Sequence, residues 1–423
     1  KLTTLCNEYR LAHAGKRLHS LEYVLGQHRG DDVMRAHYVI QNPGVPAHSM
    51  FLDIARDHGI PIHNDASIFF SLAQKTPIIG VTGTRGKSTT TSLIAHVLKN
   101  RYPRTVAAGM ATPAGAISFF SIIDRVLEWE RNDDPAPVIL ELSSWQLELL
   151  GRHRFSPRCA VVTNIYPDHL NRYRSMDDYV EAKKNIIRYQ KPGDIVVLNG
   201  DDPILQTWET DCVSGSTLLW FSKKTRLCAG EKIALPGEHN KQNARATMMV
   251  ASLWDVSEKE ACVTLQSASG VAGRLEHIRT HRGRMFVNDT TATSPDATYA
   301  ALKTFGGRSK RIILIAGGAD KKLVFDELGE YIARSVKALV LLSGTATPLL
   351  TSAAAAAGYS GSLDMANSMA EAVGKAWKRS EKDDIILLSP ACASFGLFRH
   401  EFDRGNQFVD EVAKLCEESP LHS

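Results

Sequence analysis

The chain has 423 residues, of which 43% are hydrophobic and 23% charged, so it is long enough for two or three domains with separate cores, and general disorder is excluded. Its formal net charge of +4 is small for this length, and its basic residues are scattered rather than gathered into runs. Nucleic acids and membrane surfaces are therefore not expected as partners, whereas a small anionic substrate is compatible with the composition.

The seven cysteines are odd in number and widely spaced, which argues against a disulfide framework or a zinc site. We expect reduced thiols, and we expect Cys392 to be a small buried residue rather than a nucleophile. The first residues, KLTTLCNEYR, contain no apolar signal segment, and no run of about 18 apolar residues occurs. These features predict a cytoplasmic protein without membrane insertion.

Short apolar runs bounded by turn residues alternate with amphipathic stretches along the chain. In order, the runs are YVIQNPG (38–44), PIIGVTGT (77–84), PVILELSS (137–144), CAVVTNI (159–165), DIVVLNG (194–200), MFVND (285–289), RIILIAGG (311–318), ALVLLSG (338–344) and DIILLSP (384–390). Apolar runs of this length between helical segments predict buried parallel strands in βαβ units, and hence an α/β architecture throughout. Many runs end in Gly, Asn, Asp or Ser, at the strand ends where open sheets bind ligands.

We divide the chain near residues 72 and 270. The first boundary precedes the strand KTPIIGVTGT, and the second lies in SASGVAG, a small-residue segment suited to a linker. The expected domains are therefore 1–72, 73–270 and 271–423.

The segment GVTGTRGKSTTT, residues 80–91, follows a predicted strand and precedes a helical segment. A glycine-rich turn at a helix N-terminus binds phosphate through free backbone amides, so this segment predicts an ATP site. Lys87 is expected to reach the β and γ phosphates, and Ser88 or Thr89 to hold Mg²⁺. Val81 stands where the general Walker pattern requires its first glycine, and the alternative is a structural turn with an incidental lysine. The expected ATP-binding residues of the loop are Gly83, Thr84, Gly86, Lys87, Ser88 and Thr89.

The loop T-G-T-R-G-K-S-T resembles that of Mur ligases and folylpolyglutamate synthases, which form amide bonds through acyl phosphates. Further matching segments are ELSSWQLE (141–148), TNIYPDHLNRY (163–173), YVEAKKN (179–185), NGDDP (199–203), LPGEHNKQN (235–243), NDTTATSPDAT (288–298), GGADK (317–321) and SPACASFGLFRHEFDRG (389–405). Together, and in this order, they resemble the glutamate-adding branch of the Mur ligases. The resemblance implies a three-domain α/β fold, with a P-loop central domain and Rossmann-like flanking domains. The N-terminal domain is expected to be truncated in this sequence, because the opening strand and loop of the family are either absent or lie upstream of Lys1.

The resemblance also implies catalytic residues and a second Mg²⁺ site. Glu141, His169 and Lys183 are expected to act with Lys87, and Lys183 is expected to carry a carbamate that serves as a further anionic ligand. The expected metal ligands are Ser88, Glu141, His169 and Lys183. The alternatives are a helix-capping role for Glu141 and an unengaged loop histidine at 169. Lys184, about 100° away on a helix, is expected to be a solvated lysine.

The resemblance assigns further residues to the substrates. Asn240 and Asn243 are expected on the adenine side of ATP, and Arg274 and Asp289 at its phosphate and ribose, with helix caps and a surface ion pair as the alternatives. Thr293, Lys321 and Ser394 are expected to hold the glutamate. Asn42, Pro43 and Gly44 are expected at the UDP-sugar.

The implied reaction is the ATP-dependent addition of glutamate to UDP-N-acetylmuramoyl-L-alanine for peptidoglycan synthesis, by a monomer. D-glutamate is favoured, and L-glutamate stays an alternative because Thr291 and Glu401 depart from the family near the amino acid. Two different functions also stay open, a folylpolyglutamate synthase-like ligase and a non-catalytic nucleotide-binding module.

Overall fold

The computed structural model describes residues 22–42, 45–46, 48–112, 115–168, 172–228, 232–268, 270–306 and 310–417. The chain forms two compact units, Lys1–Asn64 and Asp65–Ser423, and each is described by itself. In the described part of the first unit, β1 (Val39–Ile40) pairs in parallel with β2 (Ile62–His63), beside the helices α2 (Gly30–Met34) and α3 (Met50–Asp57). The strand predicted in YVIQNPG is therefore present, as β1.

The second unit contains two six-stranded sheets. The strands of the central sheet lie in the order β10-β9-β8-β3-β7-β4, and all are parallel. Their bounds are β3 Ile78–Thr82, β4 Val106–Ala108, β7 Val138–Glu141, β8 Cys159–Val162, β9 Ile195–Asn199 and β10 Thr217–Phe221. Because β3 lies between β7 and β8 and the chain winds outward from it in both directions, the carboxyl end of β3 is where an open sheet forms a ligand crevice.

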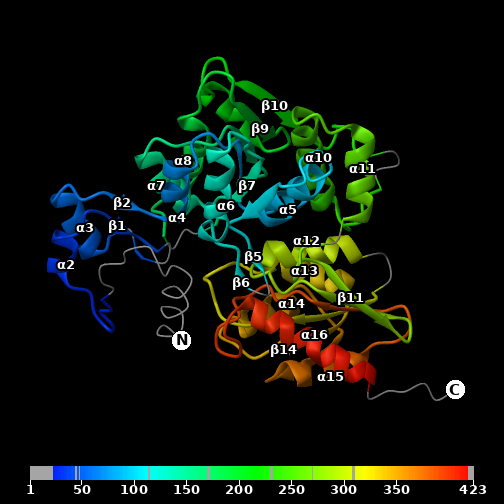
Figure 1. Ribbon diagram of the computed structural model, residues 1–423. Helices are drawn as coiled ribbons and strands as arrows, with labels where there is room; N and C mark the ends of the chain where they lie inside the picture. The colour runs from blue at the N-terminus through cyan, green and yellow to red at the C-terminus, as the bar shows by residue number, and fades with distance from the viewer. Residues whose placement is uncertain are drawn as a thin grey trace. The chain divides into compact units, whose positions relative to one another are not determined.

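Helices cover both faces of the central sheet (Figure 1). One face is covered by α4 (Asp65–Leu72), α6 (Phe120–Arg131), α7 (Ser144–Arg152) and α8 (Met176–Arg188), and the other by α5 (Lys87–Leu98), α10 (Glu238–Leu253) and α11 (Glu258–Ser267). Successive strand residues alternate between the two cores, with Ile78 in the first and Ile79 in the second. The short elements between them are the hairpin β5 (Ala111–Thr112) and β6 (Gly115–Ala116), α9 (Pro203–Gln206) and the 3₁₀ helix Thr207–Asp211.

The second sheet has the order β11-β12-β16-β13-β14-β15. Its strands are β11 Glu276–His281, β12 Arg284–Asn288, β13 Ile312–Ala316, β14 Val336–Leu342, β15 Ser362–Ala366 and β16 Ile385–Leu388. The sequence predicted parallel strands throughout, and β11 is different, because it forms an antiparallel hairpin with β12. Its sequence, EHIRTH, is polar and half-exposed, so it lacks the apolar run by which a buried strand is recognised.

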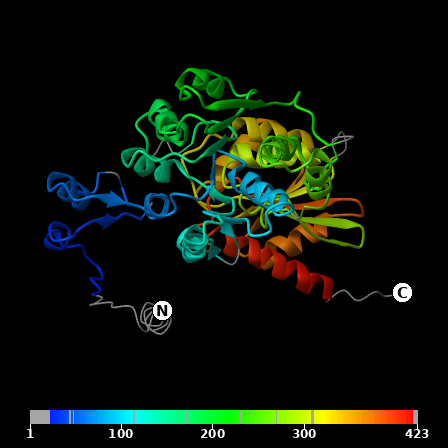
Figure 2. The ribbon, with the colours of Figure 1, turned by 45° about the horizontal axis from the view of Figure 1, so that its top comes forward.

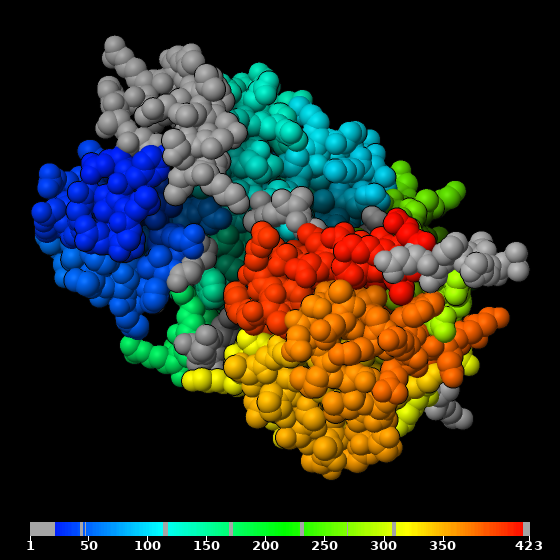
Figure 3. Space-filling model, turned by 90° about the horizontal axis from the view of Figure 1, so that it is seen from below, coloured from blue at the N-terminus to red at the C-terminus, as the bar shows by residue number. Residues whose placement is uncertain are grey.

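The helices of this sheet also form two layers. One face packs on α12 (Pro295–Phe305), α13 (Asp326–Ser335) and α14 (Thr347–Ala356), and the other on α15 (Met369–Arg379) and α16 (Glu401–Glu417). Figure 2 shows α16, in red, alongside this sheet. Figure 3 shows residues of the same region, yellow to red, forming a continuous surface.

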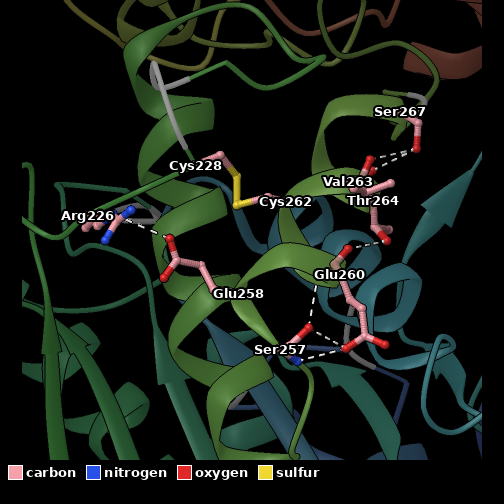
Figure 4. Close-up of a disulfide and its surroundings, with 9 residues drawn as sticks. All are labelled: Arg226, Cys228, Ser257, Glu258, Glu260, Cys262, Val263, Thr264 and Ser267. Carbon is pink, nitrogen blue, oxygen red and sulfur yellow. Dashed lines mark hydrogen bonds and ion pairs between the residues drawn. A yellow bond between two sulfur atoms is a disulfide. The ribbon is translucent and has the colours of Figure 1, made fainter.

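The expectation of seven reduced thiols is wrong for two of them, because Cys228 and Cys262 form a disulfide (Figure 4). Their Cα atoms lie 5.3 Å apart, and the bond joins the segment after β10 to α11. Folding brings together two residues separated by 34 positions, a proximity that spacing alone does not reveal. Among the described helices, none is long and apolar enough to span a bilayer.

Candidate active site

The phosphate loop connects β3 to α5, at the carboxyl end of β3. Gly83 has φ 146° and Gly86 has φ 80°. A Cβ on Gly83 would overlap Oγ1 of Thr163, and a Cβ on Gly86 would overlap the side-chain oxygen of Asn243. Both positions therefore require glycine, and the free amides at the start of the 12-residue α5 form an anion-binding site.

The other predicted loop residues line the same turn. Ser88 and Thr89 are buried in the first turn of α5, and the amide of Thr84 donates to the carbonyl oxygen of Asn164 at 2.8 Å. The side chain of Lys87 folds back over the loop and donates to the carbonyl oxygens of Gly83 and Thr84 at 3.1 and 3.0 Å. Burial lowers the pKa of Lys87, and the Glu141 carboxylate only partly opposes this. A phosphate would supply the anion that this lysine lacks.

Lys183 lies on α8 and points into the loop. Its side chain is 2% exposed, donates to the carbonyl oxygen of Gly83 at 2.9 Å, and lies 4.8 Å from the ring centre of Tyr179. Burial holds the pKa of Lys183 well below its usual value. Lys184 is not a solvated lysine, because it pairs with Asp211 at 2.8 Å and its side chain is 16% exposed. The two neighbours nevertheless have different surroundings, as the helix geometry predicts.

Glu141 ends β7 beside the loop. Its Oε2 atom is buried and has no hydrogen-bond partner. The helix-capping alternative is wrong, because α7 is capped by Ser143, which forms a capping box with Gln146. An unpartnered buried carboxylate oxygen fits a cation ligand, since burying it uncompensated is costly. His169 lies outside the described residues, and within the described ranges no three His, Cys, Asp or Glu side chains cluster as a metal site would.

Asn240 and Asn243 lie inside α10, on the face toward α5. Asn243 accepts a hydrogen bond from Thr90 Oγ1 at 3.2 Å and donates to the side-chain oxygen of Asn240, also at 3.2 Å. The helix-cap alternative is wrong, because α10 begins after Gly237 and neither asparagine is its N-cap. Both are buried, and Asn243 contacts Gly86 of the phosphate loop.

Arg274 and Asp289 have separate environments. Arg274 donates to the Ser88 hydroxyl at 3.1 Å, so the C-terminal segment contributes a cation to the phosphate loop. Asp289 is buried, and its oxygens accept from the Leu275 amide at 3.2 Å and from Ser389 Oγ at 2.8 Å. Burial raises the pKa of Asp289 to about 7. The surface-ion-pair alternative is therefore wrong for Asp289.

Two of the predicted glutamate residues are in direct contact, since Lys321 Nζ donates to Thr293 Oγ1 at 2.8 Å. Ser394 is buried in the neighbouring loop. Ala319 and Ala393 exchange backbone hydrogen bonds at 2.9 and 3.1 Å, which hold the two loops together.

The expectation that Cys392 is not a nucleophile agrees with its environment, because the residue is 2% exposed and burial raises its thiol pKa to about 12. Asn42 follows β1 in the first unit, where its carbonyl oxygen accepts from the Val45 amide at 3.0 Å. Pro43 and Gly44 lie outside the described residues.

Two arginines near these residues were not predicted from the sequence. Arg404 is fully buried and donates to the carbonyl oxygens of Thr290 and Cys392 at 2.8 and 3.2 Å. It thereby joins the segments that follow β12 and β16, and its place in the matching segment HEFDRG was the available signal. Arg85 occupies the variable position of the phosphate loop, and its only signal was its place in that motif.

Comparison with known proteins gives consistent matches. The Mur ligase middle domain matches residues 81–227, and the Mur ligase glutamate ligase domain matches residues 273–392. The UDP-N-acetylmuramoylalanine–D-glutamate ligase of Roseiflexus sp. (strain RS-1) is 39% identical, over 92% of this chain and 86% of that protein. The ligase of the same name from Clostridioides difficile (strain 630) is 32% identical, over 95% and 89%.

Solved structures agree on the fold. MurC, the UDP-N-acetylmuramate-alanine ligase of Thermotoga maritima, superposes with a TM-score of 0.63 at 19% identity, over 92% of this chain and 88% of that one. MurF ligase of Thermotoga maritima in complex with ADP gives 0.61 at 16% identity, over 92% and 99%. With two domain models matched in order and relatives this similar over nearly their whole length, the chain belongs to the Mur ligase family, among the UDP-N-acetylmuramoylalanine–D-glutamate ligases.

Proposed function

We propose that this protein adds D-glutamate to UDP-N-acetylmuramoyl-L-alanine with hydrolysis of ATP to ADP and phosphate, in peptidoglycan precursor synthesis. The observation that carries the proposal is the convergence of Lys87, Lys183 and an unpartnered Glu141 oxygen on one phosphate loop. It occurs in a chain 39% identical to an enzyme named for this reaction.

The chemistry has two balanced steps. A substrate carboxylate oxygen attacks the γ-phosphorus of ATP, and the bond to the β-phosphate oxygen breaks, giving ADP and an acyl phosphate. The glutamate amine then attacks the acyl carbon, loses a proton and expels inorganic phosphate as the amide forms. Lys87 and the free amides at the start of α5 neutralise charge on the transferring phosphoryl group, and Arg274 adds a cation from the C-terminal segment.

Magnesium fits the residues at the loop, since a hydroxyl, a carboxylate and a buried amine that can become an anion lie together there. Ser88, Glu141, His169 and Lys183 would hold it, and Mg²⁺ would supply charge neutralisation for the phosphates. Because burial lowers the pKa of Lys183, its amine loses a proton more easily, and the neutral nitrogen adds to carbon dioxide with loss of a further proton to give a carbamate. This modification of Lys183 turns a repelling cation into a ligand.

The remaining residues hold the substrates. Asn240 and Asn243 contact the adenine side of ATP, and Asp289 contacts its ribose. Lys321 pairs with the glutamate side-chain carboxylate, oriented by the hydroxyls of Thr293 and Ser394. Asn42, Pro43 and Gly44 contact the UDP-sugar. The corresponding domains are 1–72, 73–270 and 271–423, in a cytoplasmic monomer.

The test supplies pure D- or L-glutamate with UDP-N-acetylmuramoyl-L-alanine and ATP, and measures phosphate and the UDP-linked product. Turnover with D-glutamate is expected. Turnover only with L-glutamate would overturn the enantiomer and keep the ligase. Turnover only with a folate substrate would indicate a folylpolyglutamate synthase-like enzyme, and ATP binding without any turnover would indicate a non-catalytic module.

A further inference from the structure

The backbone of Arg85 is part of the phosphate loop, whereas its side chain contacts the C-terminal segment at Ser294 and Asp296. Its Nε and one terminal nitrogen donate to the two carboxylate oxygens of Asp296 at 3.0 and 3.1 Å. The same terminal nitrogen donates to Ser294 Oγ at 2.6 Å. The other terminal nitrogen lies 3.6 Å from a carboxylate oxygen of Asp168. One guanidinium therefore joins residues more than 200 positions apart in the chain.

The loop end of this connection is fixed. The Arg85 amide donates to Asn164 Oδ1 at 2.8 Å, and its carbonyl oxygen accepts from Thr163 Oγ1 at 2.6 Å and from Asn164 Nδ2 at 3.1 Å. Because both backbone groups are held by the segment after β8, the peptide cannot rotate without breaking them. The direction in which the side chain leaves the loop is therefore set by the central sheet.

The other end of the connection lies next to the predicted glutamate residues. Ser294 is buried at the start of α12, and Asp296 lies in the first turn of that helix. Thr293, which accepts a hydrogen bond from Lys321, directly precedes Ser294. A displacement of Ser294 would therefore also move the Thr293 hydroxyl, which accepts the hydrogen bond that orients Lys321.

The charges make this a specific contact rather than a chance approach. A planar guanidinium that meets both oxygens of a carboxylate is held in direction as well as in distance. Burial lowers the pKa of Arg85, but the Asp296 and Asp168 carboxylates outweigh it, so the cation is retained. Burial raises the pKa of Asp296, and Arg85 more than reverses that effect.

We propose that Arg85 is a positioning residue that fixes the Thr293–Lys321 pair relative to the phosphate loop. The affinity for glutamate then depends on Arg85, although Arg85 does not contact glutamate. This inference rests on the proposed function. It predicts that the contact acts on the KM for glutamate more than on the rate at saturation, because Lys87 and its neighbours are left unchanged.

The experiment compares Arg85→Met, Asp296→Asn and the double variant. Asp296→Asn removes the same contact without altering the phosphate loop, so a loop defect in Arg85→Met cannot explain both results. Each single variant is expected to raise the KM for D-glutamate about tenfold, with kcat changed less than about threefold. The double variant is expected to be no worse than Arg85→Met, since Asp296→Asn removes a contact that Arg85→Met has already removed. Arg85→Lys should raise the KM for D-glutamate less than Arg85→Met does, because lysine keeps the positive charge but cannot make a bidentate contact with the Asp296 carboxylate.

Arg379 supplies a matched control. It makes the same two-pronged contact with Asp364, at 2.8 and 3.1 Å, entirely within the C-terminal sheet region, and Arg379→Met should leave the KM for glutamate unchanged. Suppose that the wild-type protein ligates D-glutamate. If the Arg85→Met and Asp296→Asn variants then have the wild-type KM for glutamate, or if their effects multiply in the double variant, this inference is wrong and the proposed function stands. A wild-type protein that does not ligate D-glutamate overturns the proposed function and this inference together.

Discussion

Lys87 and Lys183 donate to the same acceptor, the carbonyl oxygen of Gly83, at 3.1 and 2.9 Å. Two ammonium groups on one neutral oxygen repel each other, and this arrangement is tolerable only when one of them is neutral or an anion lies between them. Burial lowers the pKa of Lys183, and the charge of Lys87 lowers it further. Of the two lysines, Lys183 has the more strongly lowered pKa, so it is the one that loses a proton more easily.

Replacing Lys183 by alanine should abolish ligation, because the proposed carbamate is an anionic ligand that no neighbour replaces. Small carboxylic acids should restore part of the activity by occupying the vacated anion position. Phosphate release measured with and without added acetate or formate tests this expectation.

The matched control is Lys184→Ala, which removes an ion pair with Asp211 at the edge of the same helix. Its activity should be near that of the wild type, although its free energy of unfolding should be lower, because the Lys184 side chain is only 16% exposed and paired. Equal loss of activity in both variants, without rescue, would count against a carbamate.

Lys87→Ala should lower phosphate release by roughly 100-fold or more at saturating ATP, because the loop loses the cation that stabilises the transferring phosphoryl group. Its melting temperature should stay close to that of the wild type, since the amides and glycines that shape the loop are unchanged. Near-normal turnover would show that the loop is not the phosphate site.

Asp289 should make stability fall as the pH rises. Burial raises its pKa from 3.8 to about 7, so the folded protein keeps a proton that the unfolded chain has lost. The stabilisation from this group is fully present below about pH 3.8 and is lost as the pH rises through about 7.

Asp289→Asn should remove that dependence, because its amide can still accept from Leu275 and can donate to Ser389. In urea unfolding across this pH window, the free energy of unfolding of the variant should gain on the wild type by up to about 1.4 kcal/mol per pH unit. Parallel curves for the two proteins would contradict the prediction.

The disulfide should contribute to stability when oxidised. Closing a loop with a sequence separation of 34 restricts the unfolded chain and adds about 3 to 4 kcal/mol to the free energy of unfolding in the chain-entropy treatment. A reductant should lower the unfolding midpoint of the wild type but not of Cys228→Ala, with Cys416→Ala behaving like the wild type. A wild-type midpoint that ignores reductant would refute a stabilising bond.

Sequence predicted those parts of the molecule that local chemistry determines. The nine predicted strands are present, and eight of them lie in the two six-stranded sheets, because an uninterrupted apolar run is stable between two packed layers. The ninth, β1, is a two-residue strand whose Ile40 is exposed. The other seven described strands were not predicted, namely β2, β4, β5, β6, β10, β11 and β15. Two of them, EHIRTH and SLDMA, are half-exposed and carry no such run. In the site, the phosphate loop was recognisable from its glycines, but the pairing of Arg85 with Asp296 spans 211 positions and has no local signal.

The hydrogen bond from the Leu275 amide to the Asp289 carboxylate fixes the end of the connection between the two sheets to the C-terminal sheet. Gly273 is also held on the C-terminal side, since its amide donates to Glu276 at 2.8 Å and its carbonyl oxygen accepts from the Thr291 amide at 3.1 Å. Arg274 lies between these two fixed residues, so its backbone is held in place relative to the C-terminal sheet. Any bending of the connection between the two sheets would occur before Gly273. Inserting residues before Gly273 would therefore change the length of the connection but not the direction of the Arg274 guanidinium relative to the C-terminal sheet. Inserting a residue after Arg274 would change that direction.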